Sequence, residues 1–140
     1  MGYRVVAAFV ILAIMGSGPA AAEDTRASQV ACDSNKLGGR DLAECLRTAV
    51  ETSERELSDA MTSAVKAIDM RPGVLTAQKS RWKRSLNEAE AQWINWRDLE
   101  CQDVAPFEAG ISARGGADPR LTCIIDANAG RTASLKARYK

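Results

Sequence analysis

The sequence predicts an all-α protein: a long antiparallel helical hairpin plus a shorter third helix, fastened by two disulfides. Apolar residues recur at three- and four-residue spacing over two long stretches, which is the period of a buried helix face. A Pro-Gly pair separates the two stretches, as expected for a tight turn between antiparallel helices. Four cysteines follow an apolar N-terminal segment, which favours disulfides in an exported chain.

The N-terminal segment, residues 1–22, is predicted to be a signal peptide. Arg4 supplies the positive start, the apolar run VVAAFVILAIMG follows, and Ala20-Ala21-Ala22 supplies small residues before the cleavage point. This run is shorter than the roughly 20 apolar residues of an ordinary transmembrane helix. An uncleaved anchor is the alternative. We expect an exported protein, periplasmic or secreted, with no stable membrane anchor.

The mature chain, residues 23–140, is expected to form a single helical domain. Removal of the signal peptide removes Arg4, so Lys and Arg fall from 19 to 18 and balance 18 Asp and Glu. Nucleic-acid binders usually carry a basic excess, and this neutral balance therefore argues against a nucleic-acid partner.

The first half of the mature chain is predicted to contain an arm and one long helix. Residues 23–40 are polar and contain glycine, so we expect a loop or arm. The helix is expected over 41–69, with Asp41 and Glu44 as a capping box. Its apolar stripe consists of Leu42, Leu46, Ala49, Val50, Leu57, Ala60, Met61, Ala64 and Ile68. Pro72 and Gly73 then end the helix and form the turn.

The second half is predicted to contain two helices and a long loop. One helix is expected over 75–104, with a stripe made of Leu75, Trp82, Leu86, Ala89, Trp93 and Trp96. This stripe predicts that both Trp93 and Trp96 lie in the core. Residues 105–117 contain three glycines and a proline, and we expect a loop of the kind that is often functional.

The last helix is expected over 119–137. Asp118 is the predicted N-cap and Pro119 occupies the first helical position. Its buried side is predicted to carry Leu121, Ile124, Ile125, Asn128 and Leu135.

The four cysteines, Cys32, Cys45, Cys101 and Cys123, are expected to form two disulfides. A zinc site is the alternative, but the chain has no histidine and no CxxC pair. Reflection about the Pro72 turn places all four at the far end of the hairpin. We favour the pairing Cys32–Cys45 with Cys101–Cys123, and Cys45–Cys101 with Cys32–Cys123 is the rival.

The sequence predicts neither an enzyme nor a cofactor site. Without histidine there is no histidine-activated nucleophile and no histidine metal ligand. Asp98 and Glu100 are two residues apart on a predicted helix, so they do not face each other as an acid/base pair. We therefore expect no catalytic and no metal-binding residues.

The stretch QWINWRDLEC, residues 92–101, is the most unusual in the chain. Arg97 and Glu100 are three apart, which predicts a surface ion pair. Asp98 is expected to face the third helix, with Arg131 or the backbone near Asp118 as its partner.

This stretch and the cysteines resemble the LprI-type lysozyme-inhibitor family over nearly the whole mature chain. The resemblance rests on Cys32, Cys45, Gln92, Trp93, Trp96, Arg97, Asp98, Glu100, Cys101, Gly115, Gly116, Cys123, Arg131 and Leu135. Trp96 stands where Tyr or Phe is commoner, and Ala129-Gly130 replaces a Thr and an acidic residue. The lipid-anchor cysteine of some members is absent.

The resemblance implies an exported helical domain that inhibits a lysozyme by direct binding, and hence a protein partner. Lysozymes are frequently basic proteins with acidic clefts, so an inhibitor would associate faster through an acidic surface or an inserted basic finger. The neutral mature charge does not supply an acidic surface over the whole molecule, and Arg114 is the candidate for the basic finger. The motif residues are expected to be structural, and Phe107, Glu108 and Arg114 of the Gly-rich loop are the candidate binding residues. The alternative is a structural or accessory envelope protein with no lysozyme target.

Overall fold

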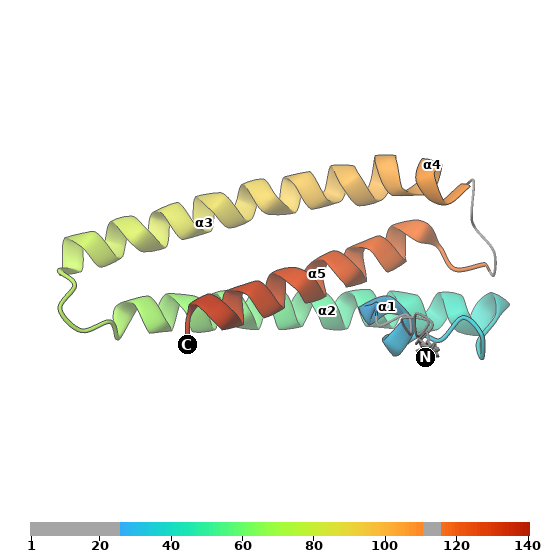
Figure 1. Ribbon diagram of the computed structural model, residues 1–140, viewed down its shortest axis with the longest axis horizontal. Coiled ribbons are helices and arrows are strands. Elements are labelled where there is room, and N and C mark those ends of the chain that lie inside the picture. Colours follow the sequence, from blue (N-terminus) through green and yellow to red (C-terminus); the bar gives the residue numbers. More distant parts are fainter. Residues whose placement is uncertain (1–25, 111–115) are drawn as a thin grey trace, which may run out of the picture.

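The computed structural model describes residues 26–110 and 116–140, and this part of the chain is all-α (Figure 1). The predicted signal peptide and Arg114 lie outside the described residues. The elements are α1 (Ala27–Ala31), α2 (Gly39–Asp69), α3 (Thr76–Leu99), the π-helical turn η1 (Glu100–Val104), α4 (Ala105–Gly110) and α5 (Pro119–Arg138).

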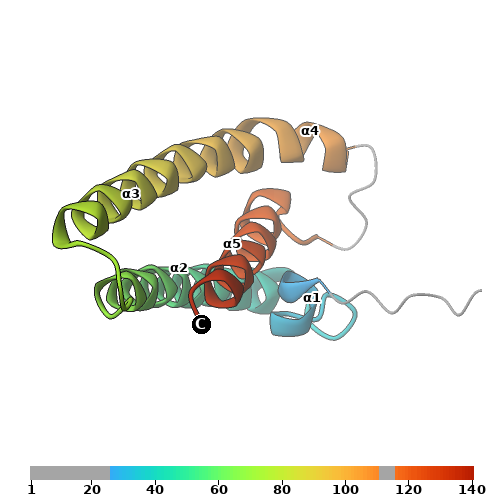
Figure 2. The same ribbon diagram turned by 60° about the vertical axis from the view of Figure 1, so that its left-hand side comes forward.

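Helices α2 and α3 form the predicted antiparallel hairpin, and α5 lies between them (Figures 1 and 2). Helix α5 runs in the same direction as α2, and the packing of these two helices is the largest contact between elements. Helix α3 packs less closely against both. The hairpin is therefore open, and α5 fills the space between its arms.

The turn of the hairpin is where the Pro-Gly pair predicts it. Helix α2 ends at Asp69, and Gly73 has a φ of +72°, a conformation that favours glycine. Lys83 of α3 forms an ion pair with the Asp69 carboxylate at 2.6 Å, and Lys79 donates to the Asp69 carbonyl at 2.6 Å. These two lysines tie the start of α3 to the end of α2.

The interior consists of two apolar clusters with a polar layer between them. The cluster nearer the turn contains Leu57, Ala60, Ala64, Ile68, Leu86 and Leu135, with Trp93 and Tyr139 packed against it. The cluster nearer the disulfides contains Cys32, Leu42, Leu46 and Ile125. Buried Ser53 on α2 and buried Asn128 on α5 lie between the two clusters along their helices.

Both disulfides have the favoured pairing, and the rival pairing is wrong. Cys32 and Cys45 fasten α1 to α2, with their Cα atoms 5.9 Å apart. Cys101 and Cys123 fasten η1 to α5, with their Cα atoms 5.4 Å apart.

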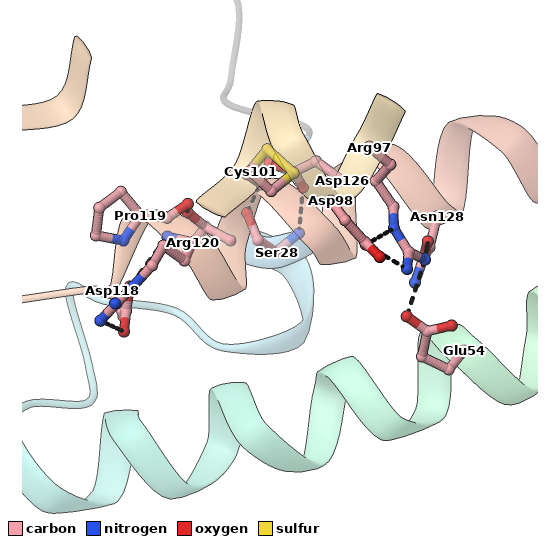
Figure 3. The surroundings of a disulfide bond; sticks show 12 residues. Ser28, Glu54, Arg97, Asp98, Cys101, Asp118, Pro119, Arg120, Asp126 and Asn128 are labelled. Carbon is pink, nitrogen blue, oxygen red and sulfur yellow. Dashed lines mark hydrogen bonds and ion pairs between the residues drawn. A yellow bond between two sulfur atoms is a disulfide. The ribbon is translucent and has the colours of Figure 1, made fainter. Parts of the chain in front are cut away.

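The N-terminal arm is partly helical, so the expectation of a loop over 23–40 is wrong for residues 27–31. A helix of five residues is too short to be stable alone. Here the Ser28 amide and hydroxyl donate to the Asp126 carboxylate of α5 at 2.7 and 3.0 Å (Figure 3). This anchor and the Cys32–Cys45 disulfide hold α1 in place.

The predicted capping box at the start of α2 is wrong. The helix begins at Gly39, with Gly38 as its N-cap, so Asp41 lies in the first turn. A carboxylate there still interacts favourably with the helix dipole. Glu44 forms an ion pair with Arg47 at 2.7 Å instead.

The predicted loop over 105–117 is also wrong in its first part, because Ala105–Gly110 form helix α4. Pro106 has no N–H to donate, and a proline inside a regular α-helix removes a hydrogen bond. The wider turn η1 directly precedes α4. Such turns accommodate residues that disrupt a regular helix. The start of α5 agrees with prediction, since the Asp118 carboxylate accepts from the Arg120 amide at 3.0 Å.

Candidate functional site

The buried face of α3 differs from the predicted apolar stripe. Leu86, Glu90 and Arg97 are buried, and Trp93 packs partly buried against the core. Trp96 is 54% exposed, so the prediction of a buried Trp96 is wrong. The true stripe contains two charged residues, which a search for apolar periodicity passes over.

Arg97 joins all three long helices. Its Nη1 donates to Asn128 Oδ1 on α5 at 2.6 Å and to Glu54 Oε1 on α2 at 2.9 Å (Figure 3). Its Nη2 and Nε donate to Asp98 Oδ1 at 2.8 and 3.0 Å. Asn128 in turn donates to the Ser53 hydroxyl at 3.0 Å. Arg97 is thus the centre of the polar layer.

These contacts correct two expectations about the motif. Arg97 is buried and pairs with Glu54 and Asp98, so the predicted surface pair with Glu100 is wrong. Asp98 binds its neighbour Arg97 and not Arg131, which forms its ion pair with Glu90.

A largely buried ion pair lies beside the contacts of Arg97. Arg131 of α5 donates to Glu90 Oε2 of α3 through Nη2 at 2.7 Å and Nε at 2.9 Å. The guanidinium carbons of Arg97 and Arg131 lie 5.6 and 5.5 Å from the centroid of the Trp93 ring, within cation–π range. The Trp93 ring therefore connects the two arginine contacts.

The remaining motif residues lie around this network. Leu135 is fully buried, Glu100 is partly buried and Gln92 is exposed. Sequence reasoning missed Glu90, although its position seven residues before Arg97 places it on the same helix face. The network fixes the C-terminal half of α3 against α5.

An exposed apolar surface runs along the outside of α3, η1 and α4. It consists of Trp96, Leu99, Val104 and Phe107, which are 54%, 63%, 39% and 80% exposed. The steps between them are three, five and three residues. The five-residue step crosses the π-turn, whose hydrogen bonds span one residue more than those of an α-helix. All four side chains therefore lie on one face, here called the apolar ridge.

The ridge lies in an acidic part of the chain. Residues 98–110 contain four carboxylates, Asp98, Glu100, Asp103 and Glu108, and no Lys or Arg. Asp103 and Glu108 are exposed on η1 and α4. Large exposed apolar patches bordered by polar groups are typical of protein interaction sites. The charge is complementary to a basic partner.

The predicted binding residues lie partly on this surface. Phe107 belongs to the ridge and Glu108 lies next to it on α4. Trp96, Leu99 and Val104 were missed as binding residues. Trp96 was assigned to the core stripe of α3, and the five-residue step from Leu99 to Val104 gives no helical period without knowledge of the π-turn.

A groove lies on another side of the molecule, between α1, α2 and α5. It has a volume of about 590 Å³ and is lined mainly by small residues and the Cys32–Cys45 disulfide. Three carboxylates, Asp41, Glu44 and Glu56, also line it. The groove contains none of the predicted binding residues.

Two carboxyl groups with altered pKa values stabilise local structure away from the ridge. The Arg120 guanidinium donates to Asp118 at 3.1 Å and is the main reason that the pKa of Asp118 is lowered from its usual 3.8. The backbone amide of Asn35 is the main cause of the lowered pKa of Asp33. Both groups are therefore held in their charged form.

Within residues 26–110 and 116–140, no three His, Cys, Asp or Glu side chains gather in a group that would hold a metal ion. None of the helices in this part of the chain is long and apolar enough to cross a membrane.

The fold and the site define a small α-helical domain that two disulfides fasten and that presents an apolar ridge with acidic surroundings. A family model described as "Lysozyme inhibitor LprI" matches residues 32–135, and the chain belongs to the LprI family. Comparisons with curated proteins and with solved structures gave no match.

Proposed function

We propose that this protein is exported and inhibits a lysozyme by binding it directly through the apolar ridge. The observation that carries the proposal is the exposure of four large apolar side chains whose spacing across the π-turn brings them to one face. Membership of the LprI family supports a protein partner of the lysozyme type.

The composition of the ridge suits a protein interface. Trp residues are enriched among the few side chains that dominate binding energy, and aromatic anchors contribute most where they become fully desolvated. Trp96 and Phe107 are the two aromatic residues of the ridge, and both are largely exposed in the isolated chain. Their burial against a partner would remove much apolar surface from water.

The surrounding charge suits the same type of partner. Carboxylates around an apolar centre attract a basic protein and raise the association rate, with a smaller effect on final affinity. Asp103 and Glu108 are the exposed carboxylates of η1 and α4. We therefore expect association with a basic lysozyme to slow as salt concentration rises.

The scaffold holds the ridge in a fixed position before binding. The Cys101–Cys123 disulfide ties η1 to α5, and Arg97 ties the end of α3 to α2 and α5. A preorganised surface loses less conformational entropy on association. The two disulfides also support an oxidising compartment, in agreement with the predicted export.

The test is a titration of the purified exported protein into a c-type lysozyme assay. The proposal expects inhibition at concentrations on the order of ten micromolar or below. A folded protein that gives no inhibition in this range would favour the alternative, an accessory envelope protein with no lysozyme target.

A further inference from the structure

The turn end of the hairpin is strongly basic, although the mature chain is neutral as a whole. Residues 66–84, here called the basic tip, contain six cations and one carboxylate, Asp69. The cations are Lys66, Arg71, Lys79, Arg81, Lys83 and Arg84. The Asp69 carboxylate, which is the only one in this segment, already forms an ion pair with Lys83.

Helix α5 brings further cations to the neighbourhood of the tip. Tyr139, next to the end of α5, packs against the cluster that contains Ile68 and Leu86. Its ring centroid is 6.1 Å from that of Trp82 on α3. The exposed side chains of Lys136, Arg138 and Lys140 therefore add to the positive charge at this end.

The basic tip also exposes large apolar side chains. Met70 and Leu75 flank the Pro-Gly turn and are 82% and 69% exposed. Figure 1 shows this turn at one extreme of an elongated molecule, with α4 at the other end of α3. Trp82 is 36% exposed and its Nε1 donates to the Tyr139 hydroxyl at 3.4 Å. Apolar, aromatic and basic groups thus coincide at one end.

We propose that the basic tip docks on the surface of an anionic phospholipid membrane. Met70 and Leu75 enter the headgroup region, and Arg71, Arg81 and Arg84 contact lipid phosphates. Cations near such a surface are attracted electrostatically, and long basic side chains keep their charge in water while their stems cover apolar groups. Stable peripheral binding usually needs two signals, here the charge and the apolar turn.

The apolar residues favour a membrane over a soluble polyanion. A polyanion in water would need only the cations and would gain little from Met70 and Leu75. At a membrane these two side chains leave water, and Trp82 beside Tyr139 is an aromatic pair of the kind that is enriched at the headgroup level. The apolar ridge, near the far end of α3, would remain accessible to a partner (Figure 1).

The test is cosedimentation of the purified exported protein with lipid vesicles. One set contains phosphatidylcholine with about one third phosphatidylglycerol, and the other contains phosphatidylcholine alone. We expect binding to the anionic vesicles and little binding to the neutral ones. The double variant Arg81→Gln with Arg84→Gln should bind the anionic vesicles tenfold or more weakly, because each cation near the surface contributes about fivefold in affinity.

Two further variants separate the signals. Met70→Ala with Leu75→Ala should also weaken vesicle binding, because both side chains are exposed and their loss removes the apolar contribution. The matched control, Arg40→Gln with Arg55→Gln, removes the same charge from exposed positions of α2 outside the tip. This control should bind as the wild type does. Circular dichroism and melting curves check that all variants fold.

Several outcomes would overturn the proposal. These are no binding to anionic vesicles, equal binding to neutral vesicles, or an equal loss in the Arg40 and Arg55 control. An unchanged affinity of the Met70 and Leu75 variant would assign the tip to soluble polyanions, which competition by polyphosphate would reveal. Lysozyme inhibition by the tip variants is measured in parallel and should not change, so this proposal and the lysozyme proposal fail independently.

Discussion

At the scale of single residues, buried Arg97 explains why the motif holds charged side chains on a helix face that packs inward. Its guanidinium contacts Glu54, Asp98 and Asn128, so its charge is compensated. Removal of one partner from such a network leaves polar groups buried without hydrogen bonds, which is strongly destabilising.

We predict that Arg97→Ala lowers the free energy of unfolding by about 3–5 kcal/mol, because Asn128, which is 0% exposed, then loses its charged donor. Urea denaturation measures the change. Arg55→Ala, at an exposed position on α2, is the control and should change stability by about 0.5 kcal/mol or less. A stability of Arg97→Ala within that same small range would contradict the assigned network.

The two tryptophans of the motif should differ in their effect on stability. Trp93 packs against the core and under two guanidinium groups, whereas Trp96 is largely exposed. We predict that Trp93→Ala costs about 2–4 kcal/mol and Trp96→Ala less than about 1 kcal/mol. Thermal or chemical denaturation of the two variants decides, and an equal cost would show that Trp96 is part of the core.

Asp118 gives a pH-dependent prediction. Its folded pKa lies below 3.8, mainly because the Arg120 guanidinium donates to it. A lowered pKa contributes stability that is present above the unfolded pKa and is lost as the pH falls through the folded pKa. Asp118→Asn keeps an N-cap acceptor but does not titrate. The wild type should therefore lose stability relative to Asp118→Asn as the pH falls below about 4, measured by melting curves. Parallel pH profiles would contradict this.

At the scale of elements, the helices with a regular apolar pattern could be predicted from the sequence, and the irregular ones could not. The course of α2 and α5 follows from apolar spacing, the end of α2 from Pro72-Gly73 and the start of α5 from Asp118-Pro119. Helix α1 could not be predicted because it depends on Asp126, almost a hundred residues away in the chain. The face of α3 was misplaced because Glu90 and Arg97, although charged, point inward.

The π-turn is the element that aligns the ridge, and a one-residue insertion there gives a prediction. Insertion of an alanine after exposed Gln102 adds a residue beyond the one that the π-turn takes up, and should rotate α4 by roughly 100° about its axis. Phe107 would then leave the ridge, and lysozyme binding should fall as much as in Phe107→Ala, as measured by isothermal titration calorimetry. Deletion of Gln102 is the control, because it shortens the step from Leu99 to Val104 to four residues, which an α-helical turn keeps on the same face. Unchanged affinity after the insertion would show that the alignment has no role in binding.

At the scale of the whole molecule, a balanced formal charge hides two different ends. The charged residues of 98–110, at the disulfide end, are all acidic, and those of 66–84, at the turn end, are six basic and one acidic. The net charge of the mature chain could be read from the sequence, and the argument against a nucleic-acid partner rests on this net charge. The separation into two ends becomes visible only once the hairpin places the turn far from the disulfides (Figure 1).

The candidate site was predictable only in part, because the fold decides which side chains stay exposed. The cysteine pairing and the LprI family were predicted and are confirmed. Phe107 was named as a binding residue within a loop, whereas the structure places it on helix α4 with 80% of its side chain exposed. Which apolar side chains remain exposed depends on packing, and here that packing is set by a buried charged network.

The most direct test of the central claim, that the apolar ridge binds a lysozyme, is an inhibition titration with a ridge variant. Trp96→Ala with Phe107→Ala removes its two aromatic side chains, and Val30→Ala with Leu75→Ala removes two exposed apolar side chains elsewhere. We predict that the wild type and the control pair inhibit equally, and that the ridge variant, folded by circular dichroism, is weaker by roughly 30-fold or more. Equal inhibition by the ridge variant would contradict the account.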